Sequence, residues 1–291
     1  MINILINSHI FLAKSILNRF ATYENGYKII YFFDYHNKLE RKMTTEAFNT
    51  EFGYYYDCNE KTLSRYSESL VGNVIKKLED IYETKHRDFQ LSDKEIEVLK
   101  RYISYQLIRD DWMMDIVRHS FVKSVYKMKY LSMEEFHKRI SVMEYYASID
   151  NRNMKNLFIE RELKENVFYS TIKDKAMIVY FNYSDLGFLN SSSCSSFFVN
   201  SKFHYLMNTT LSPKICLALC EKSSLSELFG KETDFYVSFI SNNDFVFNYN
   251  SNVYDTASKH EPYMLVGRKE DLEKTLDFIG VKYVVVKKND K

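Results

Sequence analysis

Prolines and glycines are scarce in this chain of 291 residues, which contains two prolines and seven glycines. These two residue types interrupt helices and strands and mark loops, so their scarcity predicts long helices and little flexible linker. Hydrophobic residues make up 45% of the chain and charged residues 27%. This composition is typical of a globular protein and excludes a disordered one.

The chain also lacks a dominant charge and a long hydrophobic run. Its formal net charge is +1, so no overall field attracts it to nucleic acid or to an anionic membrane. Apolar runs such as Ala176–Phe181 are far shorter than the roughly 18 residues of a membrane span. The N-terminal stretch has neither a basic leader nor a small-residue cleavage site. We therefore expect a cytoplasmic protein with no membrane partner.

Cysteines are few, and their spacing matches neither a disulfide framework nor a metal site. Cys216 and Cys220 lie in a segment that reads as a strand, which would place them roughly 13 Å apart. That distance is too long for a shared metal or a disulfide bond. We expect free thiols in the core, no metal and no cofactor.

The pattern of apolar residues predicts strands at both ends of the chain and helices between them. Asn25-Gly26 is a turn signal ahead of a hairpin that pairs Tyr27–Tyr35 with a strand around Leu39–Met43. Helical spacing follows from Glu60, and Ser92 to Glu95 reads as a capping box. The predicted helices cover residues 60–84, a long stretch from Ser92 through Met128, 133–149 and 153–165.

The last third of the chain is predicted to be rich in strands. The expected strands are Met177–Phe181, Ser196–Asn200, Lys214–Leu219, Tyr236–Ile240, Tyr263–Val266 and Tyr283–Val286, with helices at Asn250–Lys259 and Glu270–Ile279. This order predicts an α+β fold, in which a mixed sheet is built from N-terminal and C-terminal strands around a central helical lobe. We expect a single domain over residues 1–291, with the lobe at about 60–165 and the β-rich part at about 176–291.

Familiar catalytic and phosphate-binding motifs are missing. The sequence has no glycine-rich phosphate loop, no His-Glu-x-x-His and no Gly-x-Ser-x-Gly. No arginine precedes a histidine at the spacing of HEPN-type ribonuclease toxins. Candidate functional residues therefore come from less specific patterns.

Two such patterns involve His9 and the pair Gln106 and Arg109. His9 stands just before the first predicted helix, where an imidazole serves as acid, base or ligand, or else satisfies the helix entry. Gln106 and Arg109 share one face of a predicted helix at a buried edge, so Arg109 needs an anionic partner there. Glu68 on the preceding helix is a structural partner, and the alternative is an anion clamp for a ligand.

A third pattern is a basic and aromatic stripe. Lys123 and Lys127 lie along one helical side with His119 and Tyr130, as in proteins that bind single-stranded nucleic acid. The alternative is a solvated helix face, which is what most charged helix surfaces are.

Several short segments resemble the bacterial family known as domain of unknown function 4238. The segments are Ser8-His-Ile with Ile16-Leu-Asn-Arg-Phe-Ala21, Gly26–Tyr31, Glu60 with Leu63-Ser64 and Glu68, Gln106–Arg109, Phe198–Ser201, Leu211–Pro213, and Asn250 with Ala257 and Val266. The sequence departs from the family pattern at Leu12, where the family often has proline, and at Lys202, where it has aspartate.

The resemblance implies a protein from mobile elements or antiviral defence regions of bacteria. The residues themselves add a condition: if His9, Glu68, Gln106, Arg109, Ser201 and Asn250, which come from distant segments, converge in the fold, they form one polar pocket between the helical lobe and the sheet. The first hypothesis is a phage-defence effector that acts on a phosphate-containing substrate such as nucleic acid or nucleotide. In it Arg109 holds the anion, His9 acts as acid or base, and Glu68 orients one of them.

The second hypothesis is a non-enzymatic sensor or binding protein. It uses the same site, or the stripe of Lys123 and Lys127, for nucleic acid or for a protein encoded by a neighbouring gene. The replacement of the family aspartate by Lys202 favours this hypothesis.

Overall fold

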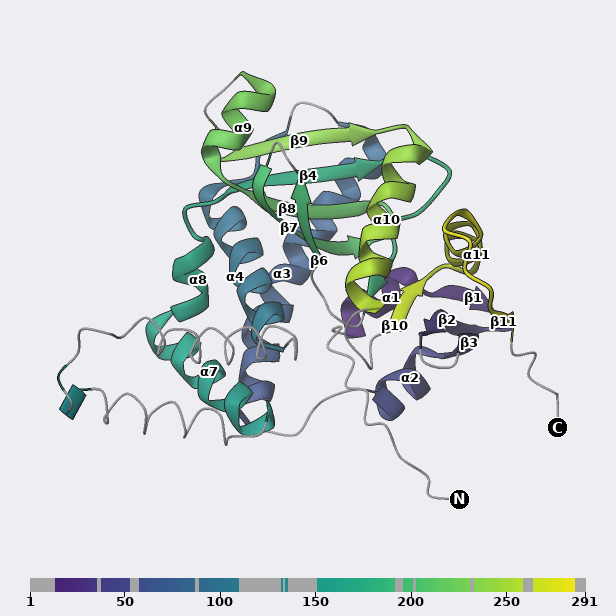
Figure 1. The fold of residues 1–291 in the computed structure, drawn as a ribbon, viewed down its shortest axis with the longest axis horizontal. Coiled ribbons are helices and arrows are strands. Elements are labelled where there is room, and N and C mark those ends of the chain that lie inside the picture. Colours follow the sequence, from purple (N-terminus) through teal and green to yellow (C-terminus); the bar gives the residue numbers. More distant parts are fainter. Residues whose placement is uncertain are drawn as a thin grey trace.

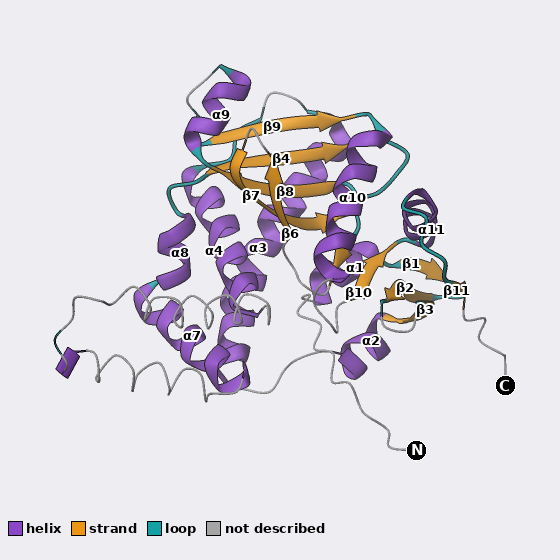
Figure 2. Cartoon of the chain, viewed as in Figure 1, coloured by secondary structure: helices purple, strands orange, loops and turns teal. Residues whose placement is uncertain are grey.

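The computed structural model of the protein describes residues 14–35, 38–52, 58–86, 89–109, 132, 134–135, 151–191, 196–200, 203–230, 233–258 and 264–285. Within these residues the chain forms two sheets with helices packed on them (Figures 1 and 2). The predicted α+β class is confirmed.

In the described part of the chain the helices are α1 (Lys14–Phe20), α2 (Thr45–Phe52), α3 (Cys58–Thr84), α4 (Asp93–Arg109), α7 (Asn151–Glu165), α8 (Val167–Ile172), α9 (Lys222–Phe229), α10 (Asn243–Ser258) and α11 (Lys269–Phe278). The strands there are β1 (Thr22–Glu24), β2 (Tyr27–Asp34), β3 (Leu39–Thr44), β4 (Ala176–Asn182), β5 (Asn190–Ser191), β6 (Ser196–Asn200), β7 (Phe203–Ser212), β8 (Ile215–Cys220), β9 (Phe235–Ile240), β10 (Met264–Gly267) and β11 (Val284–Val285).

Sheet 1 joins strands from the two ends of the chain, as predicted. Its order is β11-β3-β2-β10-β5, and β1 also pairs with β2. Asn25 and Gly26 turn the chain between β1 and β2 with φ angles of 51° and 84°. Both angles lie in the left-handed region, which a two-residue hairpin turn of this kind requires. C-terminal β10 pairs antiparallel with β2, and β11 pairs parallel with β3.

Sheet 2 is built from the β-rich part of the chain, and the sequence did not predict it as a separate sheet. Its order is β6-β7-β8-β4-β9. Among the described pairs of sheet 2, β4 and β9 are parallel and the others are antiparallel. The strand β7, which joins β6 to β8, was not predicted. Its residues Asn208, Thr209 and Thr210 are polar but buried, so the apolar alternation that signals a strand is absent.

Helices cover both faces of sheet 2. Met177 and Val179 of β4 face α3 and α4, whereas Ile178 between them faces the opposite side with Leu225 of α9. Neighbouring side chains of a strand point to opposite faces, so one strand contributes to two cores. In Figure 1, α3 and α4 lie behind sheet 2 and α10 lies in front of it.

Polar side chains fix the helical layer. The predicted capping box is confirmed, because Ser92 N donates to Glu95 Oε2 at 2.7 Å and Glu95 N donates to Ser92 Oγ at 3.3 Å. Buried Lys100 of α4 donates to the carbonyl oxygens of Lys173 and Lys175 at 2.7 and 2.6 Å. These bonds tie α4 to the chain that enters β4.

Candidate functional site

A segment of chain, residues 182–191, connects the two sheets and carries most of the buried polar contacts near them. It leaves sheet 2 at the end of β4 and enters sheet 1 as β5, which pairs with β10. Its first residue, Asn182, is fully buried and donates from Nδ2 to the carbonyls of Leu186 and Pro213 at 2.6 and 3.2 Å. Buried backbone groups of an irregular segment need such partners, and Asn182 supplies them.

Asn250 holds the same segment from α10. Its Oδ1 accepts the N–H of Leu189 at 2.8 Å, and its Nδ2 donates to the carbonyl of Gly187 at 3.0 Å and to Thr275 Oγ1 at 3.1 Å. The side chain is fully buried, and these bonds use its acceptor and both of its donor hydrogens. Asn250 is therefore a structural bridge, and the predicted role in ligand binding does not fit its surroundings.

Asp271 of α11 anchors the segment a third time. Its side chain is 1% exposed, with Oδ1 accepting the N–H of Gly187 at 2.6 Å and Oδ2 accepting Arg268 Nε at 2.6 Å. Glycine is required at 187, because a Cβ there would lie 2.3 Å from Asp271 Oδ2 and 2.9 Å from Arg268 Nη2. The guanidinium of Arg268 thus packs against the backbone of Gly187.

Two cations contact the segment 182–191, Lys214 at the carbonyl of Ser184 and Arg268 beside Gly187, and we call them the Lys214–Arg268 pair. Lys214 lies in the turn between β7 and β8 of sheet 2, and Arg268 stands between β10 and α11 of sheet 1. Lys214 is partly buried, and the side chain of Arg268 is 29% exposed. Burial lowers the pKa of Lys214, and the charge of Arg268 lowers it further.

Most of the donors of the pair have no protein acceptor among the described residues. Lys214 Nζ makes one long hydrogen bond, 3.3 Å to the carbonyl of Ser184, and Arg268 uses Nε for Asp271. Among the described residues, neither terminal nitrogen of Arg268 has a hydrogen-bond partner. Partly buried guanidinium and ammonium groups normally engage several acceptors. The N–H groups of Lys214 and Arg268 that lack a protein partner are therefore available to donate hydrogen bonds to a bound anion.

Three carboxylates act on Lys214, Asp271 before Asp185 and Glu83, and two aromatic rings stack with each other at the segment 182–191. Asp185 and Glu83 are exposed, and their charges oppose the lowering of the Lys214 pKa. The rings of Tyr82 and Tyr183 stack with centroids 4.6 Å apart, and Tyr183 donates to the carbonyl of Tyr82 at 3.1 Å. Tyr183 directly precedes Ser184, whose carbonyl accepts from Lys214 Nζ, and the charge of Arg268 opposes the raising of the Tyr82 pKa by burial.

The structure does not bring the predicted site residues together where it describes them. Gln106 of α4 is fully buried, as expected, but its neighbours Tyr105 and Leu107 belong to the core on the α3 and α4 side. Asn250 lies in α10, whose Tyr249 and Val253 belong to the core that contains Cys216, on the other face of sheet 2. The sheet separates the two amides.

The other predicted site residues are not described at side-chain level. Glu68 lies in α3 and Arg109 lies in α4, but the structure does not describe these two side chains. His9, Lys123, Lys127 and Ser201 lie outside the described residues. Their roles remain predictions.

The cysteines match the expectation of core thiols. Cys216 and Cys220 are free and buried, and burial raises their pKa values to about 12 and about 11. Thiols react as thiolates, so these two are inert at neutral pH. Within the described residues, no group of three or more His, Cys, Asp or Glu side chains could hold a metal ion. The described helices also include none of the length and apolarity that a membrane crossing needs.

No protein-family model matches the chain, and no curated protein or solved structure is similar to it. The resemblance to domain of unknown function 4238 therefore stays a prediction from short motifs.

Proposed function

We propose that the protein binds a phosphate-containing ligand, such as a nucleotide or nucleic acid, at the Lys214–Arg268 pair. An arginine presents several N–H donors in one plane and suits the oxygens of a phosphate, and a lysine adds a compact positive charge. The aromatic pair of Tyr82 and Tyr183 beside the cations favours a ligand that carries a ring as well as a phosphate.

The observation that carries this proposal is the set of donors without a protein partner on two cations that contact the same segment. Holding like charges together at a partly buried position costs free energy, and an anion between them removes that cost. Asp271 compensates part of the charge, but both of its oxygens already accept hydrogen bonds. Asp185 and Glu83 are exposed, so water and salt weaken their effect on the pair.

We further propose the phage-defence role that the family resemblance implies. In the enzymatic version, the pair holds the phosphate in place of Arg109, and His9 remains the proposed acid or base. In the alternative version, the protein is a non-enzymatic sensor that binds nucleic acid, or a protein encoded beside it. Formation of a product from the bound ligand distinguishes the two versions.

Binding measurements on purified protein test the proposal. Calorimetric titrations with inorganic phosphate, ATP and a short single-stranded oligonucleotide are compared for wild type, Lys214→Met and Arg268→Gln. Each substitution is expected to weaken binding about tenfold or more, because a hydrogen bond to a charged group contributes about 1.5–3 kcal/mol. Affinity for the oligonucleotide should fall as salt is raised.

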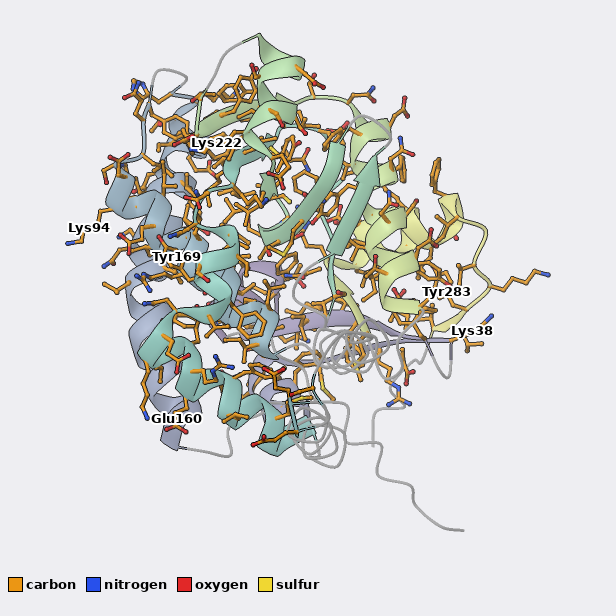
Figure 3. All side chains as sticks on the ribbon, turned by 60° about the vertical axis from the view of Figure 1, so that its left-hand side comes forward. Lys38, Lys94, Glu160, Tyr169, Lys222 and Tyr283 are labelled. Atoms are coloured by element: carbon orange, nitrogen blue, oxygen red, sulfur yellow. The ribbon has the colours of Figure 1, made fainter. Side chains whose placement is uncertain are left out.

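Lys222→Gln is the matched control. Lys222 is an exposed cation on α9 that is paired with Asp234 at 2.6 Å, and Figure 3 shows it in the upper left part of the molecule. Its loss should leave every affinity unchanged. Equal binding by all four proteins, or no binding by wild type, would refute the site. Incubation of wild type with each ligand, followed by chromatography, then reports whether a product forms.

A further inference from the structure

Glu40 is a carboxylic acid buried in sheet 1. It lies on β3 and is 2% exposed, with Phe33 of β2 and Val285 of β11 as its cross-strand neighbours. Among the described residues its Oε2 has no hydrogen-bond partner. The next cation on its face of β3, Lys42, is already paired with Glu24 at 2.8 Å. An ionised carboxylate at this position is poorly compensated.

The charged groups that face Glu40 come from α11 and the residues after it. Burial and, after it, the charge of Glu273 raise the pKa of Glu40, the charge of Lys269 lowers it, and the net result is a pKa of about 6. Lys269 is shared with Glu273, which lies 3.6 Å from it. The pKa of Tyr283 is raised to about 12. Burial is the largest cause, and the charge of Glu40 contributes to the increase. From the two neighbouring strands, Phe33 and Val285 contribute no charge.

The cover over Glu40 on the open side is a short edge strand. In the described part of sheet 1, β11 pairs with β3 alone, and its two valines are 62% and 43% exposed. The N–H of Val284 donates to the carbonyl of Lys38 at 3.0 Å. Figure 3 shows Tyr283 and Lys38 close together at this edge of the molecule. A two-residue edge strand with exposed side chains opens at low cost, and opening admits water to Glu40.

We propose that Glu40 is a pH-sensitive latch that holds the C-terminal segment, residues 280–285, on β3 when protonated and loosens it when ionised. In the closed state the side chain is buried, its Oε2 has no hydrogen-bond partner among the described residues, and the charge of Glu273 disfavours ionisation, whereas in the open state water solvates the carboxylate. The sign follows from linkage: closure is strongest below the ordinary pKa of 4.5 and weakens as pH rises through about 6. The difference between these two values corresponds to a change in the opening equilibrium of up to about 30-fold.

Amide hydrogen exchange of Val284, corrected for the intrinsic pH dependence of exchange, measures the latch. In wild type, protection is expected to fall by up to about 30-fold between about pH 4 and pH 7.5. Glu40→Gln keeps the shape without the charge, so its protection should stay high and constant. Glu273→Gln should reduce the fall in part, because it removes the facing carboxylate and frees Lys269.

Glu270→Gln is the matched control, since Glu270 is an exposed carboxylate in the first turn of α11. It should behave like wild type. Constant protection in wild type, or the same fall in Glu40→Gln, would overturn the proposal. If Glu40→Gln does not fold, an unchanged fall in Glu273→Gln would overturn it instead.

Discussion

Replacing Asn250 by alanine tests whether this residue is structural or binds a ligand. The structure shows its amide bonded to the N–H of Leu189, the carbonyl of Gly187 and the hydroxyl of Thr275, all buried. Alanine removes the partner of all three groups at once. The segment 182–191 then loses these bonds to α10, while Asn243 Oδ1 at the start of α10 still accepts the N–H of Leu186 at 3.2 Å and Asp271 still holds the segment from α11.

The expected loss of stability is large. A buried group left without its partner costs about 1–3 kcal/mol. Two of the three groups here are backbone groups, the N–H of Leu189 and the carbonyl of Gly187. Water entering the vacated space recovers part of this cost. We therefore expect Asn250→Ala to lower the free energy of unfolding by about 3 kcal/mol. Since whole domains are stable by about 5–15 kcal/mol, the variant should still fold.

Urea unfolding followed by far-ultraviolet circular dichroism measures this difference. The control is Asn252→Ala on the same helix, where the partly buried side chain makes only a solvent-exposed hydrogen bond, to the carbonyl of Asn248 at 2.6 Å. It should change stability by less than about 0.5 kcal/mol. If Asn250→Ala costs no more than the control, but weakens ligand binding, the structural assignment is wrong and the sequence-based interpretation is right.

Three further substitutions test other parts of the fold. Gly187→Ala should cost about 1–3 kcal/mol in urea unfolding, because its Cβ would lie 2.3 Å from the fixed carboxylate of Asp271. Buried Glu162 accepts the N–H groups of Phe168 and Tyr169 at the start of α8, at 2.5 and 2.9 Å. Glu162→Gln should lower the melting temperature, because an amide has only one acceptor oxygen for these two donors. Ser92→Ala should cost about 1 kcal/mol in urea unfolding through the lost cap of α4, and no loss would contradict the capping geometry.

The sequence predicted the fold wherever local signals agreed with tertiary packing. The hairpin of β2 and β3, the capping box of α4 and the strand, helix and strand at the C-terminus all lie close to their predicted bounds. The start of α10 was missed by seven residues, because its first turns hold Asn, Phe and Tyr, which are weak helix formers. Burial of Val246 and Tyr249 stabilises these turns, and a sequence does not display that contribution.

The candidate site was much less predictable. Asn250 was found, but its role depends on partners in two other segments that only folding brings near. Lys214 and Arg268 were missed, because they are far apart in the chain and neither belongs to a known motif. The available signal was weak: Arg268 follows a glycine where a strand gives way to a helix, a junction that often holds functional residues.

Opposite signs in stability and binding separate a ligand-binding residue from a structural one at this junction. Lys214 makes one hydrogen bond of 3.3 Å, and burial and Arg268 both disfavour its charge, so its ammonium group contributes little to stability. Lys214→Met keeps the aliphatic packing and removes that disfavoured charge. It should leave the free energy of unfolding unchanged or raise it, while anion binding weakens. Asn250→Ala should lower stability, and any effect on binding should follow from displacement of the segment 182–191. A loss of stability in Lys214→Met as large as in Asn250→Ala would mean that the lysine serves the fold, and that the anion site lies elsewhere.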